Sequence, residues 1–175
     1  MRGIERLAAV NRSTEPMATA LPNLPMTETV LIRLLRISVY GLVPYFEPVF
    51  RRIGLKETAF HVLCLLLTSE GGTASPSELS EMVGTSRANM THILDSLESD
   101  GLVSRTVAST DGRRHSIKIT RAGTKAANDA VPKLAEPLQN AFSDLSPEEV
   151  AVLDKLLRKT IVSLDKGAHP LRAVA

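Results

Sequence analysis

The sequence is poor in the residues that many enzymes and secreted proteins use for chemistry and cross-links. A single cysteine, Cys64, cannot form an internal disulfide, so a reducing cytoplasm is the expected compartment. The four histidines are scattered without metal-ligand spacing, and there is no glycine-rich phosphate loop, so we expect no metal and no cofactor. The opening residues lack the pattern of a secretion leader, and no uninterrupted apolar run reaches about 18 residues, which predicts no membrane partner.

Positive charge is concentrated in one short stretch. The 175 residues carry a net charge of only +2, which does not by itself indicate a nucleic-acid partner, and 43% hydrophobic residues suffice for one packed domain. Residues 104–121 nevertheless carry an excess of +4, because five basic residues there face one acidic residue, Asp111. The basic residues are Arg105, Arg113, Arg114, Lys118 and Arg121. This local excess predicts a surface that binds phosphate.

Helical spacing and its breaks divide the chain into segments. Residues 1–25 contain three prolines and no sustained apolar period, so we expect a disordered N-terminal arm. Residues 26–54 predict a long helix with Thr27 as N-cap, kinked or interrupted by Pro44 and Pro48. The other predicted segments are a domain of three short helices and a hairpin over 55–123, C-terminal helices over 124–166 broken by Pro132 and Pro137, and a tail over 167–175.

Two short helices joined by a tight junction carry the first functional signal. Ser75 and Pro76 begin a helix that ends at Gly84, and at most four residues separate it from a helix over 88–99, as in a helix-turn-helix. The predicted core stripe of the second helix is Met90, Ile93, Leu94 and Leu97. Its opposite face is polar and free of acidic groups near the N-terminus, which suits the major groove of DNA. An ordinary surface helix has the same amphipathic pattern, so this signal alone leaves both interpretations open.

The residues that follow favour DNA binding. A turn, "STDGRR", separates the alternating stretches "LVSRTVA" and "HSIKIT", which predicts a hairpin with Arg113 and Arg114 at its tip. Guanidinium groups at that position can enter an adjacent minor groove or bind phosphates. The predicted fold is therefore mainly α with a small β-hairpin wing: a winged helix-turn-helix domain flanked by N- and C-terminal dimerisation helices.

Three stretches carry a family resemblance: "GLKETAFHVLCLLL", "SPSELSEMVGTSRANMTHILDSLESDGLVSR" and "DGRRHSIKITRAG". Over residues 42–123 the chain resembles the MarR family of bacterial transcriptional regulators. The resemblance implies a homodimer, held by residues 26–54 and 124–166, that binds a pseudo-palindromic operator in double-stranded DNA. It also implies a repressor that a small aromatic or anionic effector releases, whereas some relatives activate and a minority respond to thiol oxidation.

The resemblance also assigns residues. The predicted DNA-binding residues are Thr85, Ser86, Arg87, Asn89, Thr91, His92, Arg105, Asp111, Arg113 and Arg114. Asp111 falls where relatives brace the wing against an arginine, for which Arg105 is the candidate. The chain departs from the family at His92, where arginine is common, and at Lys56, where a Ser or Thr cap is usual. Phosphate attraction at His92 therefore requires a protonated imidazole.

The flanking helices carry two further expectations. The last helix begins with Ser146 as N-cap and Pro147, and a long amphipathic helix at each end of the domain favours dimerisation, since a palindromic site requires two-fold symmetry. An effector pocket is expected where the first two helices meet the winged domain. Its candidate ligand-binding residues are Tyr40, Tyr45, Phe46 and His61, for which ordinary core or dimer packing is the alternative.

Three alternatives to this interpretation remain. A winged-helix module can use the same surfaces to bind protein, and Cys64 can sense oxidation rather than pack inertly in "VLCLLL". The stretch "GTSRA" nearly matches the nucleophile elbow of a hydrolase, but that elbow follows a buried strand and this stretch follows a short helix. We therefore expect no catalytic residue and no enzyme activity.

Overall fold

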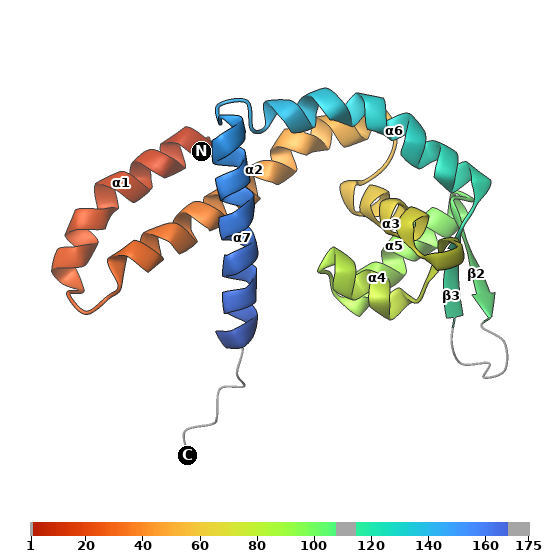
Figure 1. The fold of residues 1–175 in the computed structure, drawn as a ribbon, viewed down its shortest axis with the longest axis horizontal. Coiled ribbons are helices and arrows are strands. Elements are labelled where there is room, and N and C mark those ends of the chain that lie inside the picture. The colour runs from red at the N-terminus through yellow and green to blue at the C-terminus, as the bar shows by residue number, and fades with distance from the viewer. Residues whose placement is uncertain (1, 108–114, 168–175) are drawn as a thin grey trace, which may run out of the picture. The chain divides into compact units, whose positions relative to one another are not determined.

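The computed structural model describes residues 2–107 and 115–167 (Figure 1). Its internal contacts divide the chain into two units, residues 1–133 and 134–175, which are described separately. The first unit contains the winged domain and two long N-terminal helices, and the second contains the end of α6 and helix α7. The mainly helical fold with a small antiparallel sheet confirms the predicted fold class.

The N-terminal residues form a helix rather than the disordered arm predicted for 1–25. Helix α1 covers Gly3–Ala20, and α2 covers Met26–Ile53, so that the two form a hairpin (Figure 1). The Arg33 guanidinium donates to the Ser13 hydroxyl at 2.7 Å, and the Arg6 guanidinium lies 3.6 Å from the centre of the Tyr40 ring. These contacts between distant residues stabilise α1, which local sequence pattern cannot indicate.

The prolines do not interrupt the helices in which they lie. Helix α2 runs through Pro44 and Pro48, and it begins after Pro25 rather than with Thr27 as its cap. Helix α6, Arg121–Asn140, likewise contains two prolines, Pro132 and Pro137. The predicted interruptions are therefore wrong: each proline removes one hydrogen bond, and the remaining bonds of helices 28 and 20 residues long carry them past it.

Helix α2 also passes the length and composition test for a membrane span, with a mean hydropathy of 1.4 over an 18-residue window. Only 6% of that window is buried within the structure. Its apolar runs are nevertheless interrupted, because Arg33 and Arg36 lie within them. Because arginines are costly inside a bilayer and Arg33 is bound to Ser13, α2 fits better as a helix that packs against protein.

The winged domain is built around the core side of α5. Its elements are α3 (Glu57–Thr68), a 3₁₀ turn (Glu70–Gly72), β1 (Thr73–Ala74), α4 (Pro76–Val83), α5 (Arg87–Ser99), β2 (Val103–Val107) and β3 (His115–Ile119). All four residues of the predicted α5 stripe are buried, and they pack with Leu63, Leu66 and Leu79 of the other two helices. The three helices α3, α4 and α5 thus share one core, which fixes the outward face of α5.

The wing has one strand more than the predicted hairpin. Strands β2 and β3 pair antiparallel from Val103 opposite Ile119 to Val107 opposite His115. The two-residue strand β1 pairs with the other edge of β3 and gives the order β1-β3-β2. Ile117, which is fully buried, joins this sheet to the helical core.

The second unit ends in α7, Pro147–Gly167, whose start agrees with the prediction. The Ser146 hydroxyl accepts a hydrogen bond from the Glu149 amide at 3.2 Å, and the Glu149 carboxylate accepts one from the Ser146 amide at 2.8 Å. This reciprocal pair is a capping box, which satisfies two amides that a helix start otherwise leaves free.

The base of the wing is joined to α6 at one crowded point. The Thr120 hydroxyl donates to the carbonyls of Gly101 and Leu102 at 2.8 and 3.1 Å and accepts from the Gly123 amide at 3.0 Å. A β-carbon added to Gly123 would lie 2.1 Å from the Leu102 carbonyl oxygen. Thr120 and Gly123 both belong to the stretch "ITRAG", so this contact explains why the stretch contains a hydroxyl residue and a glycine at these positions.

We expect Gly123→Ala to lower the free energy of unfolding by at least about 2 kcal/mol, because the added methyl group meets backbone that cannot turn away. Chemical denaturation measures the effect. Gly3→Ala is the matched control, since the space around Gly3 is open and the same substitution should change stability by less than about 1 kcal/mol. Equal stability of the two variants would contradict the close contact.

Candidate nucleic-acid interface

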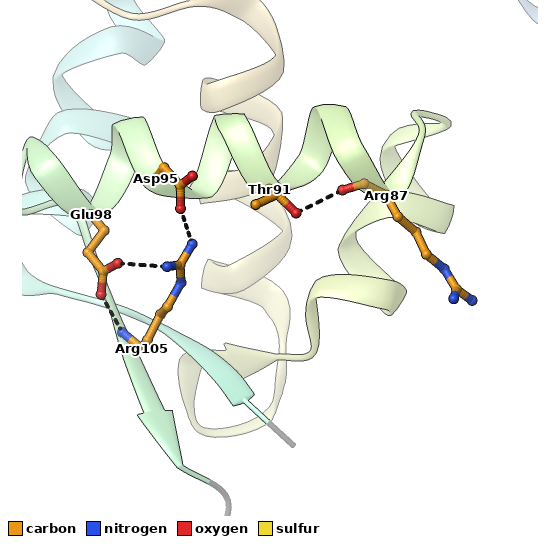
Figure 2. Close-up of polar contacts among 5 residues, drawn as sticks. All are labelled: Arg87, Thr91, Asp95, Glu98 and Arg105. Carbon is orange, nitrogen blue, oxygen red and sulfur yellow. Dashed lines mark hydrogen bonds and ion pairs between the residues drawn. The ribbon is translucent and has the colours of Figure 1, made fainter. Parts of the chain in front are cut away.

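The N-terminal half of α5 presents an exposed polar surface. Ser86 is the N-cap, and its hydroxyl accepts a hydrogen bond from the Asn89 amide at 3.2 Å. The first turn contains no acidic residue, and Arg87 forms no ion pair among the described residues. Figure 2 shows the Arg87 side chain extending away from the helix. An arginine beside a helix N-terminus is a suitable arrangement for phosphate or guanine.

Asn89 is oriented by its own helix turn. Its side-chain amide donates to the Thr85 hydroxyl at 2.7 Å, which uses one of its two N–H groups. The second N–H and the carbonyl oxygen stay available, and these are the two groups that pair with adenine in a major groove. Thr91 is also exposed, and its hydroxyl donates to the Arg87 carbonyl at 3.0 Å. The hydroxyl hydrogen is therefore already used, and the hydroxyl oxygen can accept a hydrogen bond from a bound partner.

The remaining residue predicted on this face, His92, is exposed one turn beyond Ala88. The structure therefore brings together six of the predicted DNA-binding residues on one end of α5 and its preceding turn. They are Thr85, Ser86, Arg87, Asn89, Thr91 and His92. Sequence spacing placed them on a common face, but the bond between Thr85 and Asn89 is visible only in the structure.

Arg105 of β2 binds the C-terminal half of α5 (Figure 2). Its guanidinium is ion-paired with the Asp95 carboxylate and lies 3.4 Å from a carboxylate oxygen of Glu98. The Arg105 backbone amide also donates to Glu98 at 3.2 Å. One arginine thus fixes the first strand of the wing to the helix, through both its side chain and its backbone.

This network changes the role expected for Arg105. The sequence prediction pairs it with Asp111, which lies outside the described residues together with Arg113 and Arg114. The described partners of Arg105 are Asp95 and Glu98, so its charge is directed toward the protein. It offsets part of the negative charge on the C-terminal half of α5, and that half is therefore less repulsive to DNA than the sequence alone indicates.

The predicted ligand-binding residues separate into two groups. Tyr45 and Phe46 are in contact, with ring centres 4.9 Å apart, and they begin a row of rings that continues through Phe50 and Phe60 to His61. Tyr40 lies elsewhere, beneath Arg6. The four side chains do not converge on one point, and the row of rings agrees with the alternative of ordinary packing between α2 and α3.

A cavity lies beside α5, in the region where the sequence predicted an effector pocket. It has a volume of about 380 Å³ and is bounded by the end of α2, the start of α3 and one side of α5. Asn89 and His92 form part of its wall, so it adjoins the predicted DNA surface. The four predicted ligand-binding residues do not line it, because its walls come from segments up to fifty residues apart.

Cys64 lies on α3 in a partly buried position. Burial raises the pKa of its thiol above the usual value. A raised pKa lowers the fraction of reactive thiolate at neutral pH, which argues against Cys64 as an oxidation sensor.

Comparison with known proteins gives consistent matches. Residues 55–115 match the MarR family model. The chain is 31% identical over 142 residues to the transcriptional repressor MprA of Escherichia coli K12, a match that covers 81% of each chain. It resembles AbsC, a MarR family regulator of Streptomyces coelicolor, with a TM-score of 0.72 and 25% identity over 82% of this chain and 97% of AbsC. Sco3205 of the same organism, solved in complex with DNA, has a TM-score of 0.73 and 23% identity over 87% of this chain and 94% of its own.

We expect the ion pair of Arg105 with Asp95 to contribute about 0.5–1 kcal/mol to folding stability, since both side chains are partly exposed. A double-mutant cycle with Arg105→Ala and Asp95→Ala measures this coupling by chemical denaturation. The cycle for Lys125 and Asp129, an exposed pair within α6, serves as the comparison and should give less. A coupling near zero for Arg105 and Asp95 would contradict the network.

We expect Cys64 to react more slowly with iodoacetamide at pH 7.5 than free cysteine does, because its raised pKa leaves less thiolate. The rate should rise with pH and reach half of its maximum above the pH found for free cysteine. Protein unfolded in guanidinium is the control and should not show this difference. A folded-state rate above that of free cysteine would support the thiol-responsive alternative.

Proposed function

This chain belongs to the MarR family and is a DNA-binding transcriptional regulator, and from that premise we propose that it is a homodimeric repressor that binds a pseudo-palindromic operator. The observation that carries the proposal is the exposed end of α5. Its exposed side chains are those of Asn89, which is oriented by a hydrogen bond, and of Ser86 and Thr91, which carry hydroxyl groups. Arg87 has no ion pair among the described residues, and the first turn contains no acidic group. MprA, the relative described above, is a repressor, which supports the direction of regulation.

In the proposed complex the N-terminal half of α5 enters the major groove. Asn89 and Thr91 face base edges, while Arg87 binds phosphate or guanine. Arg105 acts as a positioning residue: by binding Asp95 and Glu98 it orients β2 relative to α5. The tip of the hairpin, with Arg113 and Arg114, is proposed to bind phosphates or the adjacent minor groove.

Dimerisation is supported by apolar surface that a single chain leaves uncovered. On α2 these exposed residues include Val39, Val43 and Leu31. On α7 they are Val150, Val152, Leu156, Leu157, Ile161, Val162 and Leu164. Exposed apolar faces of this extent favour a partner, and a second copy supplies the two-fold symmetry that a palindromic operator needs. We accordingly propose residues 26–54 and 124–166 as the dimerisation segments.

An effector that releases the DNA is the remaining part of the proposal. The family resemblance supports a small aromatic or anionic compound. The alternative of a protein-interaction module is not favoured, because the chain belongs to a family of DNA-binding regulators.

We expect duplexes enriched by this protein from a random library to contain a two-fold symmetric site, bound by two chains per duplex. Binding should weaken steeply with salt, because phosphate contacts release counterions. Replacing both Arg113 and Arg114 by alanine should lower the slope of log K against log salt by up to about 3.6, at about 0.9 for each of the four phosphate contacts that the two chains can lose. Fluorescence anisotropy on a labelled duplex measures both quantities.

Two controls separate the roles of wing and helix. Asn89→Ala should relax selectivity at one base position by about 5- to 150-fold while it leaves the salt slope unchanged. The double variant Arg2→Ala/Arg12→Ala removes two exposed arginines outside the proposed dimerisation segments and should leave binding near the wild-type value. Absence of any enriched duplex, or binding independent of salt, would refute the proposed function.

A further inference from the structure

Thr85 and Asn89 form a side-chain pair at the turn between α4 and α5. The Asn89 side-chain amide donates to the Thr85 hydroxyl at 2.7 Å. Asn89 is exposed on the proposed DNA surface, whereas Thr85 is partly buried in the turn. The pair thus consists of one residue that can meet a base edge and one that supports it from the side of the protein.

The position of Thr85 is set by the end of α4. Gly84 ends that helix in a left-handed conformation, with a φ of 72°. The Gly84 amide donates to the Glu81 carbonyl at 3.1 Å, and the Thr85 amide donates to the Ser80 carbonyl at 3.0 Å. This double closure is a Schellman motif, and Ser80 at its start is buried. The Thr85 hydroxyl is therefore attached to backbone that has little freedom to move.

The Asn89 side chain is restrained at both of its ends. Its own backbone amide donates to the Ser86 hydroxyl at 3.2 Å, which fixes the first turn of α5. Its terminal amide is bound to Thr85. A side chain restrained in this way loses little conformational entropy when it pairs with a base, so its orientation before binding affects its choice of base.

The direction of the bond to Thr85 decides which groups of Asn89 face outward. An asparagine amide has two N–H donors and one carbonyl acceptor. With one N–H on Thr85, the other N–H and the oxygen are left, and this combination matches N7 and the N6 amino group of adenine. An amide turned over, with its oxygen toward Thr85, would present two N–H groups, which match the two acceptors of guanine.

The Thr85 hydroxyl is free to remain an acceptor for Asn89. Its own hydrogen has no acceptor among the residues that the structure describes, so water or a DNA phosphate can take it. A hydroxyl that donates outward keeps its lone pairs for the Asn89 N–H.

We propose that Thr85 is a positioning residue that makes Asn89 selective for adenine. By accepting one N–H of Asn89, it directs the other N–H to N7 and the carbonyl oxygen to the N6 amino group. The inference rests on the proposed function, because it requires Asn89 to lie in the major groove. It also separates the roles of two residues that the sequence placed together as DNA contacts: Asn89 reads the base, and Thr85 acts through Asn89.

The first experiment measures the restraint without DNA, by ¹⁵N relaxation of the Asn89 side-chain amide. Thr85→Val removes the hydroxyl and keeps the shape, and it should lower the order parameter of that amide to below about 0.6, the range of flexible groups. Thr85→Ser keeps the hydroxyl and should retain the wild-type value. Thr68→Val is the matched control, because Thr68 is exposed on α3 and bonds only to carbonyls of its own helix. Equal order parameters in the wild type and Thr85→Val would overturn the proposal.

The second experiment uses the enriched duplex, at the base position where Asn89→Ala relaxes selectivity. We expect adenine there, and its replacement by 7-deazaadenine, which lacks the N7 acceptor, should weaken wild-type binding about 2- to 10-fold. Thr85→Val and Thr85→Ala should reduce this ratio toward 1, and Thr85→Ser should restore it. A merely structural role would weaken both duplexes equally and leave the ratio unchanged. Thermal unfolding verifies that each variant is folded.

A double-mutant cycle completes the test. In the Asn89→Ala background, Thr85→Val should have no further effect on the preference between the two duplexes, because Thr85 acts through Asn89. Guanine at the Asn89 position, or an unchanged ratio in Thr85→Val, would overturn the inference and leave the proposed DNA binding intact. Absence of any enriched duplex would instead refute the proposed function, a result that the order parameters cannot produce.

Discussion

The contact between the Leu102 carbonyl and α6 determines where the wing begins. That oxygen accepts hydrogen bonds from the Thr120 amide and hydroxyl, and it lies so close to Gly123 that no side chain fits there. The end of α5, the start of β2 and the start of α6 are therefore held together at one point. A rigid joint at this point fixes the base of β2 relative to α5.

Arg105 adds orientation to that joint. The Leu102 contact fixes only the base of β2, whereas the pairs with Asp95 and Glu98 fix the direction in which the strand leaves it. The same pairs offset negative charge at the C-terminal half of α5, whereas Arg87 at the N-terminal end has no ion pair within the described part of the chain. The orientation of β2 and the charge along α5, which carries the proposed DNA-binding surface, thus both depend on Arg105.

The sequence predicted interactions between residues that lie close together in the chain, and it missed interactions between residues that lie far apart. The caps at Ser75 and Ser146 follow from spacing of three residues, and they are present. The cap at Ser86 was not predicted, and α5 begins one residue earlier than expected. The long helices were underestimated, because a single proline was expected to break a helix, and because the contacts of α1 with α2 are invisible in a sequence pattern. The partners of Arg105 lie seven and ten residues away on another element, and the walls of the cavity come from three helices. Such contacts depend on the tertiary fold, for which one sequence gives no spacing rule.

The end of α2 links the proposed dimerisation surface to the DNA-reading helix. Phe50 is buried on α2, and it lines the same cavity as Ile93 and Leu97 of α5. Gly54 ends α2 in a left-handed conformation only four residues later, so the chain turns into α3 directly beside this cavity. The geometry of this junction therefore relates the direction of α2 to that of α5. In the proposed symmetric dimer that relation sets the separation of the two α5 helices, so this junction determines the fit of the proposed dimer to both half-sites.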